Sequence, residues 1–210
     1  MDFPDTLPGQ LYLLAYPSGS DRLASGCELG LLLRAAALTE LLLCGLLQDR
    51  DRCPHPDGPA PPQLDPVLAG VLDRITASRP RRWEHWVKAD ERATMRAVRD
   101  LLCAQGRLEL VGHRVLGLFP AERPLLRDPA AREHLAAAVR ATLDRDRVGE
   151  DDPRLAAVVS LAAAGGLRTV LSRRQRREHR ARIAELTAIT GPVPPALRSA
   201  IRGRRAAHSA

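Results

Sequence analysis

The stretch LLLRAAALTELLLCGLL, residues 31–47, decides the fold. Leucine and alanine, which are strong helix formers, fill it, and apolar residues occupy nearly every side from Gly30 to Leu47. A helix that is apolar all round is enclosed by other elements rather than lying at a surface. We therefore expect a bundle built around this helix. Arg34 and Glu40 stand out within it, because burying a charge costs free energy unless the charge is paired.

The composition agrees with a helical domain. The chain has 210 residues, of which 45% are hydrophobic and only 3% aromatic. Such a chain can bury a core, and a Leu- and Ala-rich sequence favours helices over sheets. Its four cysteines form no CxxC pair, which argues against a zinc site and against a disulfide framework.

Periodicity and helix-capping residues define the other elements. Six prolines between Pro54 and Pro66 predict a loop over residues 49–66, since proline lacks a backbone donor. Alternation over Leu108–Phe119, with Gly112-His113 between its halves, predicts one β-hairpin, and residues 120–129 are expected to form a loop. Further helices are predicted over residues 7–16, 68–75, from 83, 91–105, 130–143, 153–164 and 173–188.

The fold class predicted from these patterns is mainly α: a helical bundle around a central buried helix, with one β-hairpin. We expect residues 1–190 to form the domain and residues 191–210 to be a basic, mobile tail. Residues 173–210 contain ten Arg and two Glu, a net charge of +8. The whole chain carries +7, so residues 1–172 carry 7 − 8 = −1. The basic character therefore belongs to the C-terminal part.

Signatures of known chemistry are missing. The sequence contains no GxGxxG, GxxxxGK[ST], GxSxG or HExxH motif, and its six histidines are scattered. We expect neither an enzyme nor a bound cofactor or metal. No apolar run is long enough to span a bilayer, and the acidic start Met1–Asp5 lacks the basic residues of a secretory signal. These features predict a cytoplasmic protein.

Six segments, taken in order, carry a resemblance to a known family: LPGQLYLLAY (7–16), the stretch at 31–47, LDPVLAGVLDRI (64–75), RRWEHWV (81–87), VLGLFPAERPLLRDPAAREHL (115–135) and DDPRLAAVVSLAAAGGL (151–167). They resemble the Golgi phosphoprotein 3 family, and the Arg-rich style is similar to its actinobacterial branch. The resemblance covers about residues 7–190 and implies a helical fold with one protruding β-hairpin. It also implies a peripheral membrane protein, because eukaryotic members bind phosphatidylinositol 4-phosphate.

The family's headgroup site uses a tryptophan and several arginines. By resemblance, its first arginine falls on Arg34 and the next on Arg92. Met95 occupies the position of another arginine, for which nearby Arg96 is a candidate substitute. The tryptophan falls near Ser25 and is absent. The resemblance thus implies lipid headgroup binding by Arg34, Arg92 and Arg96.

Each candidate also has a purely structural interpretation. Arg34 could pair internally, for instance with Glu40, and Arg92 could lie on a solvated helix face. In the family the hairpin contributes to membrane or subunit contacts, for which Val111 and Leu116 are candidates here, although packing on the core is the alternative. One helix face is predicted to carry a basic stripe attracted to anionic membranes, with a solvated helix end as the alternative; its members are Arg173, Arg176, Arg177 and Arg180.

Our leading hypothesis from the sequence is a non-enzymatic protein on the inner face of the membrane that binds anionic, phosphoinositide-like headgroups. Two alternatives remain open: an adaptor or scaffold of the same fold, and a nucleic-acid binder that uses the C-terminal arginines. Nucleic acid is the less favoured partner, because no helix-turn-helix or zinc signature supports it. A protein partner, or a homo-oligomer formed through the hairpin, is compatible with the same sequence.

Overall fold

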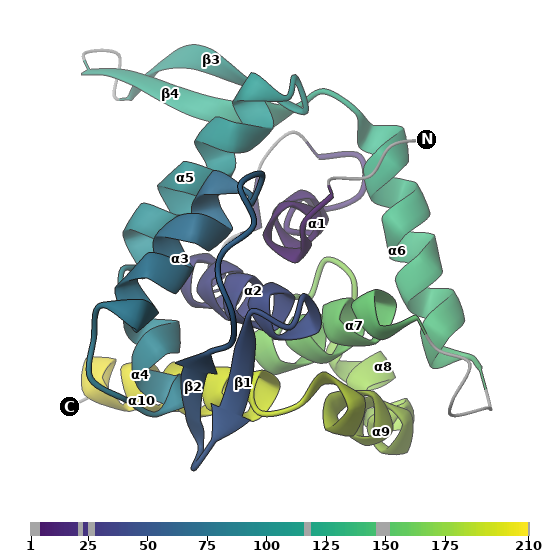
Figure 1. Ribbon diagram of the computed structural model, residues 1–210. Coiled ribbons are helices and arrows are strands. Elements are labelled where there is room, and N and C mark those ends of the chain that lie inside the picture. Colours follow the sequence, from purple (N-terminus) through teal and green to yellow (C-terminus); the bar gives the residue numbers. More distant parts are fainter. Residues whose placement is uncertain (1–4, 21–22, 25–27, 116–118, 146–151, 210) are drawn as a thin grey trace.

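A buried helix forms the centre of the molecule, as expected. The computed structural model describes residues 5–20, 23–24, 28–115, 119–145 and 152–209. Helix α2 (Leu29–Leu43) runs through the middle of this fold, and every residue from 31 to 41 is buried (Figure 1). Around it pack α1 (Leu7–Leu14), α3 (Pro66–Thr76), α4 (Trp83–Lys88), α5 (Glu91–Ala104), α7 (Pro153–Gly165) and α10 (Val193–His208). The predicted mainly α bundle is thus confirmed.

Local sequence explains where many of these helices begin. Aspartate followed by proline precedes three of them: Asp65 for α3, Asp128 for α6 (Pro129–Leu143) and Asp152 for α7. In each case the carboxylate accepts hydrogen bonds from backbone N–H groups of the first turn. The following proline has no N–H to leave unsatisfied and its φ already suits a helix. These side chains therefore act as helix caps.

The last 20 residues correct the sequence-based prediction. Residues 191–210 were expected to be a mobile tail, yet they contain α10, which packs against α2, α4 and α7. Its apolar residues Val193, Leu197 and Ile201 repeat every four positions and are buried. Proline stands in the first turn of this helix, where it is favoured. Arg198, Arg202 and Arg205 are exposed on this helix, although the helix itself belongs to the core.

The predicted helix over 173–188 is also divided. Helix α8 (Arg173–Glu178) ends at His179, and α9 (Arg180–Thr190) begins there. Ser172 and Gln175 form a capping box that fixes the start of α8. Helix α8 has no buried residue, whereas α9 packs against α7. Because α8 buries none of its residues, packing does not require α8 and α9 to form one continuous helix.

A short hairpin replaces the loop predicted over residues 49–66. Strands β1 (Leu47–Arg50) and β2 (Cys53–Pro56) pair antiparallel, with Leu47 opposite Pro56. Asp51 and Arg52 both have positive φ, as a two-residue turn of this hand requires. Proline is tolerated because a two-stranded sheet consists of edge strands only. The prolines thus correctly indicated that this segment is not a helix, but they do not exclude a strand.

The second hairpin is longer than predicted. Strands β3 (Leu108–Val115) and β4 (Phe119–Leu126) pair from Leu108↔Leu126 to Val115↔Phe119. Gly112 therefore lies within β3 rather than at the turn, and residues 120–126 are strand rather than loop. Figure 1 shows the hairpin projecting from one end of the bundle. Its base is anchored, because Leu108 and Leu126 are buried and the Tyr16 hydroxyl donates a hydrogen bond to the Pro124 carbonyl.

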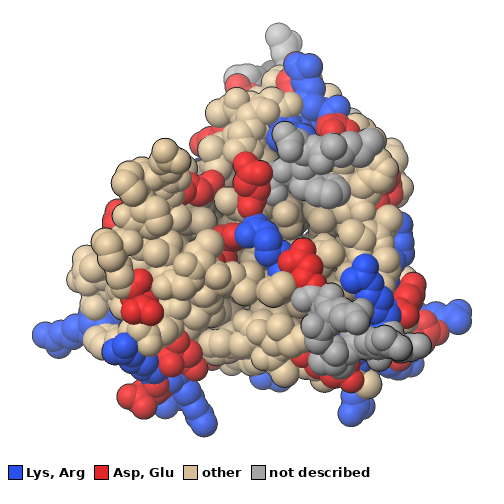
Figure 2. Space-filling view, turned by 45° about the vertical axis from the view of Figure 1, so that its right-hand side comes forward, with Lys and Arg blue, Asp and Glu red and all other residues tan. Residues whose placement is uncertain are grey.

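The surface shown in Figure 2 carries both signs of charge. Lys and Arg side chains are interspersed with Asp and Glu, and wide areas between them are uncharged (Figure 2). This face therefore offers no broad basic patch.

Tyr12 on α1 gives a prediction about alkaline pH. Its side chain is buried, and this burial raises the pKa of the phenol from 10.0 to about 12. The folded state therefore holds the proton more tightly than the unfolded state, so stability present below pH 10 is lost as the pH rises to about 12. The free energy of unfolding should fall over this range by about 2 kcal/mol more in the wild type than in Tyr12→Phe. Parallel pH profiles of the two proteins would contradict this prediction.

Candidate functional site

Arg34 is buried on α2, and among the described residues it has no acidic partner. Only 2% of its surface is exposed. Its Nε donates a hydrogen bond to the Trp86 carbonyl oxygen (3.1 Å), and its Nη1 donates to Thr94 Oγ1 (3.3 Å). Its Nη2 is buried and has no hydrogen-bond partner in the described part of the chain. Both partners are neutral, so they satisfy two donors without neutralising the charge.

The predicted structural alternative, an internal pair of Arg34 with Glu40, is wrong. Glu40 lies six positions further along α2, about 240° around a helix of 3.6 residues per turn. Its carboxylate instead binds Arg154 of α7 and accepts a hydrogen bond from the Leu7 N–H (2.7 Å). The two charged residues of the central helix therefore serve different neighbours.

A small hollow adjoins Arg34 between α3 and α5. Its volume is about 180 Å³, and we call it the Arg34 hollow. Arg74 and Asp90 also line it and form an ion pair with each other. Burial, with a smaller contribution from the positive charge of Arg74, lowers the pKa of Arg34 to about 10. Arg34 thus stays charged at neutral pH. Two guanidiniums face one carboxylate, which leaves the hollow a net positive charge suited to an anion.

Arg92 and Arg96 do not join Arg34. Arg92 is exposed and lines a different hollow, of about 660 Å³, with residues of α10. Arg96 is also exposed. On α5 each stands two positions from Thr94, the residue that contacts Arg34, and residues two apart on a helix do not face each other. The structure therefore does not bring the three predicted headgroup residues to one place.

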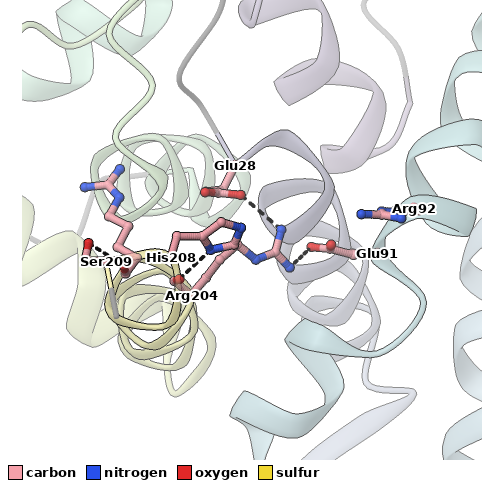
Figure 3. A pocket seen from close by; sticks show the side chains of 7 residues that line it. Glu28, Glu91, Arg92, Arg204, His208 and Ser209 are labelled. Carbon is pink, nitrogen blue, oxygen red and sulfur yellow. Dashed lines mark hydrogen bonds and ion pairs between the residues drawn. The ribbon is translucent and has the colours of Figure 1, made fainter.

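The hollow beside Arg92 is partly neutralised. Figure 3 shows Arg204 of α10 reaching between Glu28 and Glu91, while Arg92 lies apart with no interaction drawn (Figure 3). The Arg204–Glu28 ion pair measures 3.0 Å, and Arg204 also pairs with Glu91. Both acidic residues that line this hollow thus bind one arginine, which ties α10 to the starts of α2 and α5.

The predicted basic stripe is distributed over two helices. Arg173, Arg176 and Arg177 belong to α8, whereas Arg180 belongs to α9. Arg173 and Arg176 line a pocket with arginines of α10, and Arg180 lines another hollow. Sequence reasoning missed the α10 arginines as partners because it placed them in a tail. Their spacing, Arg198, Arg202 and Arg205, was the signal that could have found them.

Val111 and Leu116 are the candidate contact residues of the β3–β4 hairpin. Val111 is half-buried in β3, and the neighbouring Leu110 is 36% exposed. Leu116 lies outside the described residues.

Over the ranges that the structure describes, no group of three His, Cys, Asp or Glu side chains could hold a metal ion. Within the same ranges no helix is long and apolar enough to cross a bilayer.

Fold and site together define a helical protein with a buried, unneutralised arginine at its centre and arginine-lined hollows around it. The sequence model of the Golgi phosphoprotein 3 (GPP34) family matches residues 7–203. The chain therefore belongs to the Golgi phosphoprotein 3 family. The match extends through most of α10, which agrees with the place of that helix in the core. A comparison with curated proteins gave no significant match.

Proposed function

We propose that the protein is a non-enzymatic peripheral membrane protein of the cytoplasmic membrane face, and that it binds a phosphorylated inositol lipid headgroup. One phosphate group would enter the Arg34 hollow. The observation that carries this proposal is the free Nη2 of Arg34. Leaving a buried charged donor unsatisfied costs free energy, and a phosphate oxygen would satisfy both its hydrogen bond and its charge.

The size and rim of the hollow support a single phosphate group. Its volume of about 180 Å³ is smaller than the roughly 300 Å³ typical of sites that enclose a drug-sized ligand. The remainder of a headgroup would therefore stay outside, near Arg74. The side chain of Arg74 is 60% exposed, so it could move from Asp90 to a phosphate. Arg92 and Arg96, which lie elsewhere on α5, would contribute through general attraction to an anionic surface.

Vesicle sedimentation tests the proposal. Neutral phosphatidylcholine vesicles would be compared with vesicles containing phosphatidylinositol 4-phosphate, and with phosphatidylserine vesicles of equal charge. We expect the strongest binding to the inositol lipid. Arg34→Met should weaken that binding about tenfold or more, because a hydrogen bond to a charged group contributes roughly 1.5–3 kcal/mol. Arg79→Met, at an exposed position between α3 and α4, is the matched control and should bind as the wild type does.

A stability measurement separates binding from folding. Arg34 contacts no acidic side chain that the structure describes, so Arg34→Met leaves no carboxylate unpaired. The free energy of unfolding should consequently change by less than about 1.5 kcal/mol, far less than breaking a buried ion pair costs. Undiminished binding of the folded Arg34→Met variant to the inositol lipid would refute the proposal.

A further inference from the structure

The pocket that α8 shares with α10 is lined by six arginines and, among the described residues, by no acidic residue. It lies where the end of α7, the segment after it, α8 and α10 meet, and its volume is about 230 Å³. The side chains of its other lining residues are small or apolar. We call it the six-Arg pocket; its arginines are Arg168, Arg173, Arg176, Arg198, Arg202 and Arg205.

The fold explains why these arginines converge. Arg198, Arg202 and Arg205 follow one face of α10 at the i, i+4, i+7 spacing. The same helix buries Leu197 and Ile201 against the bundle, so the orientation of this basic face is fixed. The capping box of Ser172 sets the start of α8, which supplies the next two members. The pocket is thus held by packed elements and not by a loose tail.

Arg176 is half-buried, whereas the other five arginines of the pocket are exposed. Its Nη1 donates a hydrogen bond to the Ala163 carbonyl at the end of α7 (3.5 Å). Gly166 has φ +68, and a side chain there would come within 3.4 Å of that same nitrogen. Glycine therefore both permits the left-handed turn that ends α7 and leaves room for the guanidinium. Burial is the main cause that lowers the pKa of Arg176. The positive charges of Arg168, Arg173 and Arg205 lower it further.

These six charges have no carboxylate partner within the part of the chain that the structure describes. None of the six forms an ion pair with a carboxylate among the described residues, in contrast to Arg174, which pairs with Glu178 on the outside of α8. Arg202 acts electrostatically on Glu84, but Glu84 already binds Lys88 and Ser199. Like charges gathered in a concave surface raise its positive potential and attract anions.

We infer that the six-Arg pocket binds a compact anion carrying two or more neighbouring phosphate groups. Six guanidiniums exceed the charge of any single phosphate, and their planar forks suit phosphate oxygens. A concave pocket of about 230 Å³ fits a small polyphosphate or a multiply phosphorylated headgroup better than the extended backbone of a nucleic acid. This site is separate from the Arg34 hollow, with which it shares no lining residue.

The test uses the full chain and two matched double variants of α8. Arg173→Gln with Arg176→Gln removes two charges from the pocket, whereas Arg174→Gln with Arg177→Gln removes two from the same helix outside it. Calorimetric titration with inorganic tripolyphosphate, at fixed salt, measures binding. We expect the first double variant to weaken binding at least tenfold and the second to weaken it less than threefold. Arg198→Gln with Arg202→Gln should reproduce the first result from α10.

Further arms identify the source of the phosphate groups. Soluble inositol trisphosphate and vesicles containing a bisphosphorylated phosphatidylinositol would each be titrated against the same variants. Loss confined to the pocket variants with either probe supports the inference and assigns the free or the lipid source. Equal weakening by both α8 variants, no binding of any of these probes, or binding only of single-stranded nucleic acid would overturn it. Arg34→Met should leave tripolyphosphate binding unchanged, which keeps this result independent of the proposed function.

Discussion

Substituting Leu197 in α10 is expected to destabilise the whole protein. Leu197 is fully buried where α10 packs on α2, α4 and α7. Leu197→Ala should lower the free energy of unfolding by about 2–5 kcal/mol, because it removes apolar contacts and leaves a cavity. Leu197→Asp would bury a charge without a partner, so this variant should not fold under conditions in which the wild type is stable.

Ala206→Asp on the exposed side of the same helix is the control, and it should change stability by less than about 0.5 kcal/mol. Urea unfolding followed by circular dichroism measures all three variants. If residues 193–208 were a mobile tail, Leu197→Ala would behave like Ala206→Asp. That outcome would contradict the assignment of α10 to the core.

Removing the carboxylate of Glu40 should have an effect of similar size. This buried group accepts hydrogen bonds from both terminal nitrogens of Arg154, at 2.5 and 3.2 Å, and from the Leu7 N–H at the start of α1. It thus joins α1, α2 and α7. Glu40→Leu leaves the arginine and the N–H without their acceptor, and we expect the free energy of unfolding to fall by about 3 kcal/mol.

A double-mutant cycle separates the ion pair from the other contacts. The side chain of Arg154 is 36% exposed, so Arg154→Ala alone should cost less than Glu40→Leu. Combining the two changes should cost less than their sum, because they remove the same interaction. Strict additivity of the two losses would show that Glu40 does not act through Arg154.

Much of the fold could be predicted because its signals are local. The apolar stretch at 31–47 indicated the central helix, and aspartate-proline pairs marked the starts of α6 and α7. Errors arose where local signals have two meanings. Proline before residue 193 could end one helix or begin another, and only packing on α2 decides between them.

The candidate sites were less predictable, because they depend on distant parts of the chain. Arg34 was singled out correctly as an unusual charge in an apolar helix. Whether it pairs internally depends on Trp86 and Thr94, which come from α4 and α5. The six-Arg pocket likewise forms only because α8 and α10 lie close together in the fold. Periodicity in the sequence does not reveal such a contact between distant segments.

The most direct measurement is the stabilisation of the protein by a water-soluble inositol phosphate headgroup. A ligand that binds only the folded state adds RT ln(1 + [L]/Kd), about 2.7 kcal/mol at a concentration of 100 times Kd. When a headgroup that carries a 4-phosphate is added, the wild type and Arg79→Met should gain this stability, whereas Arg34→Met should gain little. Equal stabilisation of wild type and Arg34→Met, or none in the wild type, would contradict the claim that the uncompensated guanidinium of Arg34 receives a phosphate.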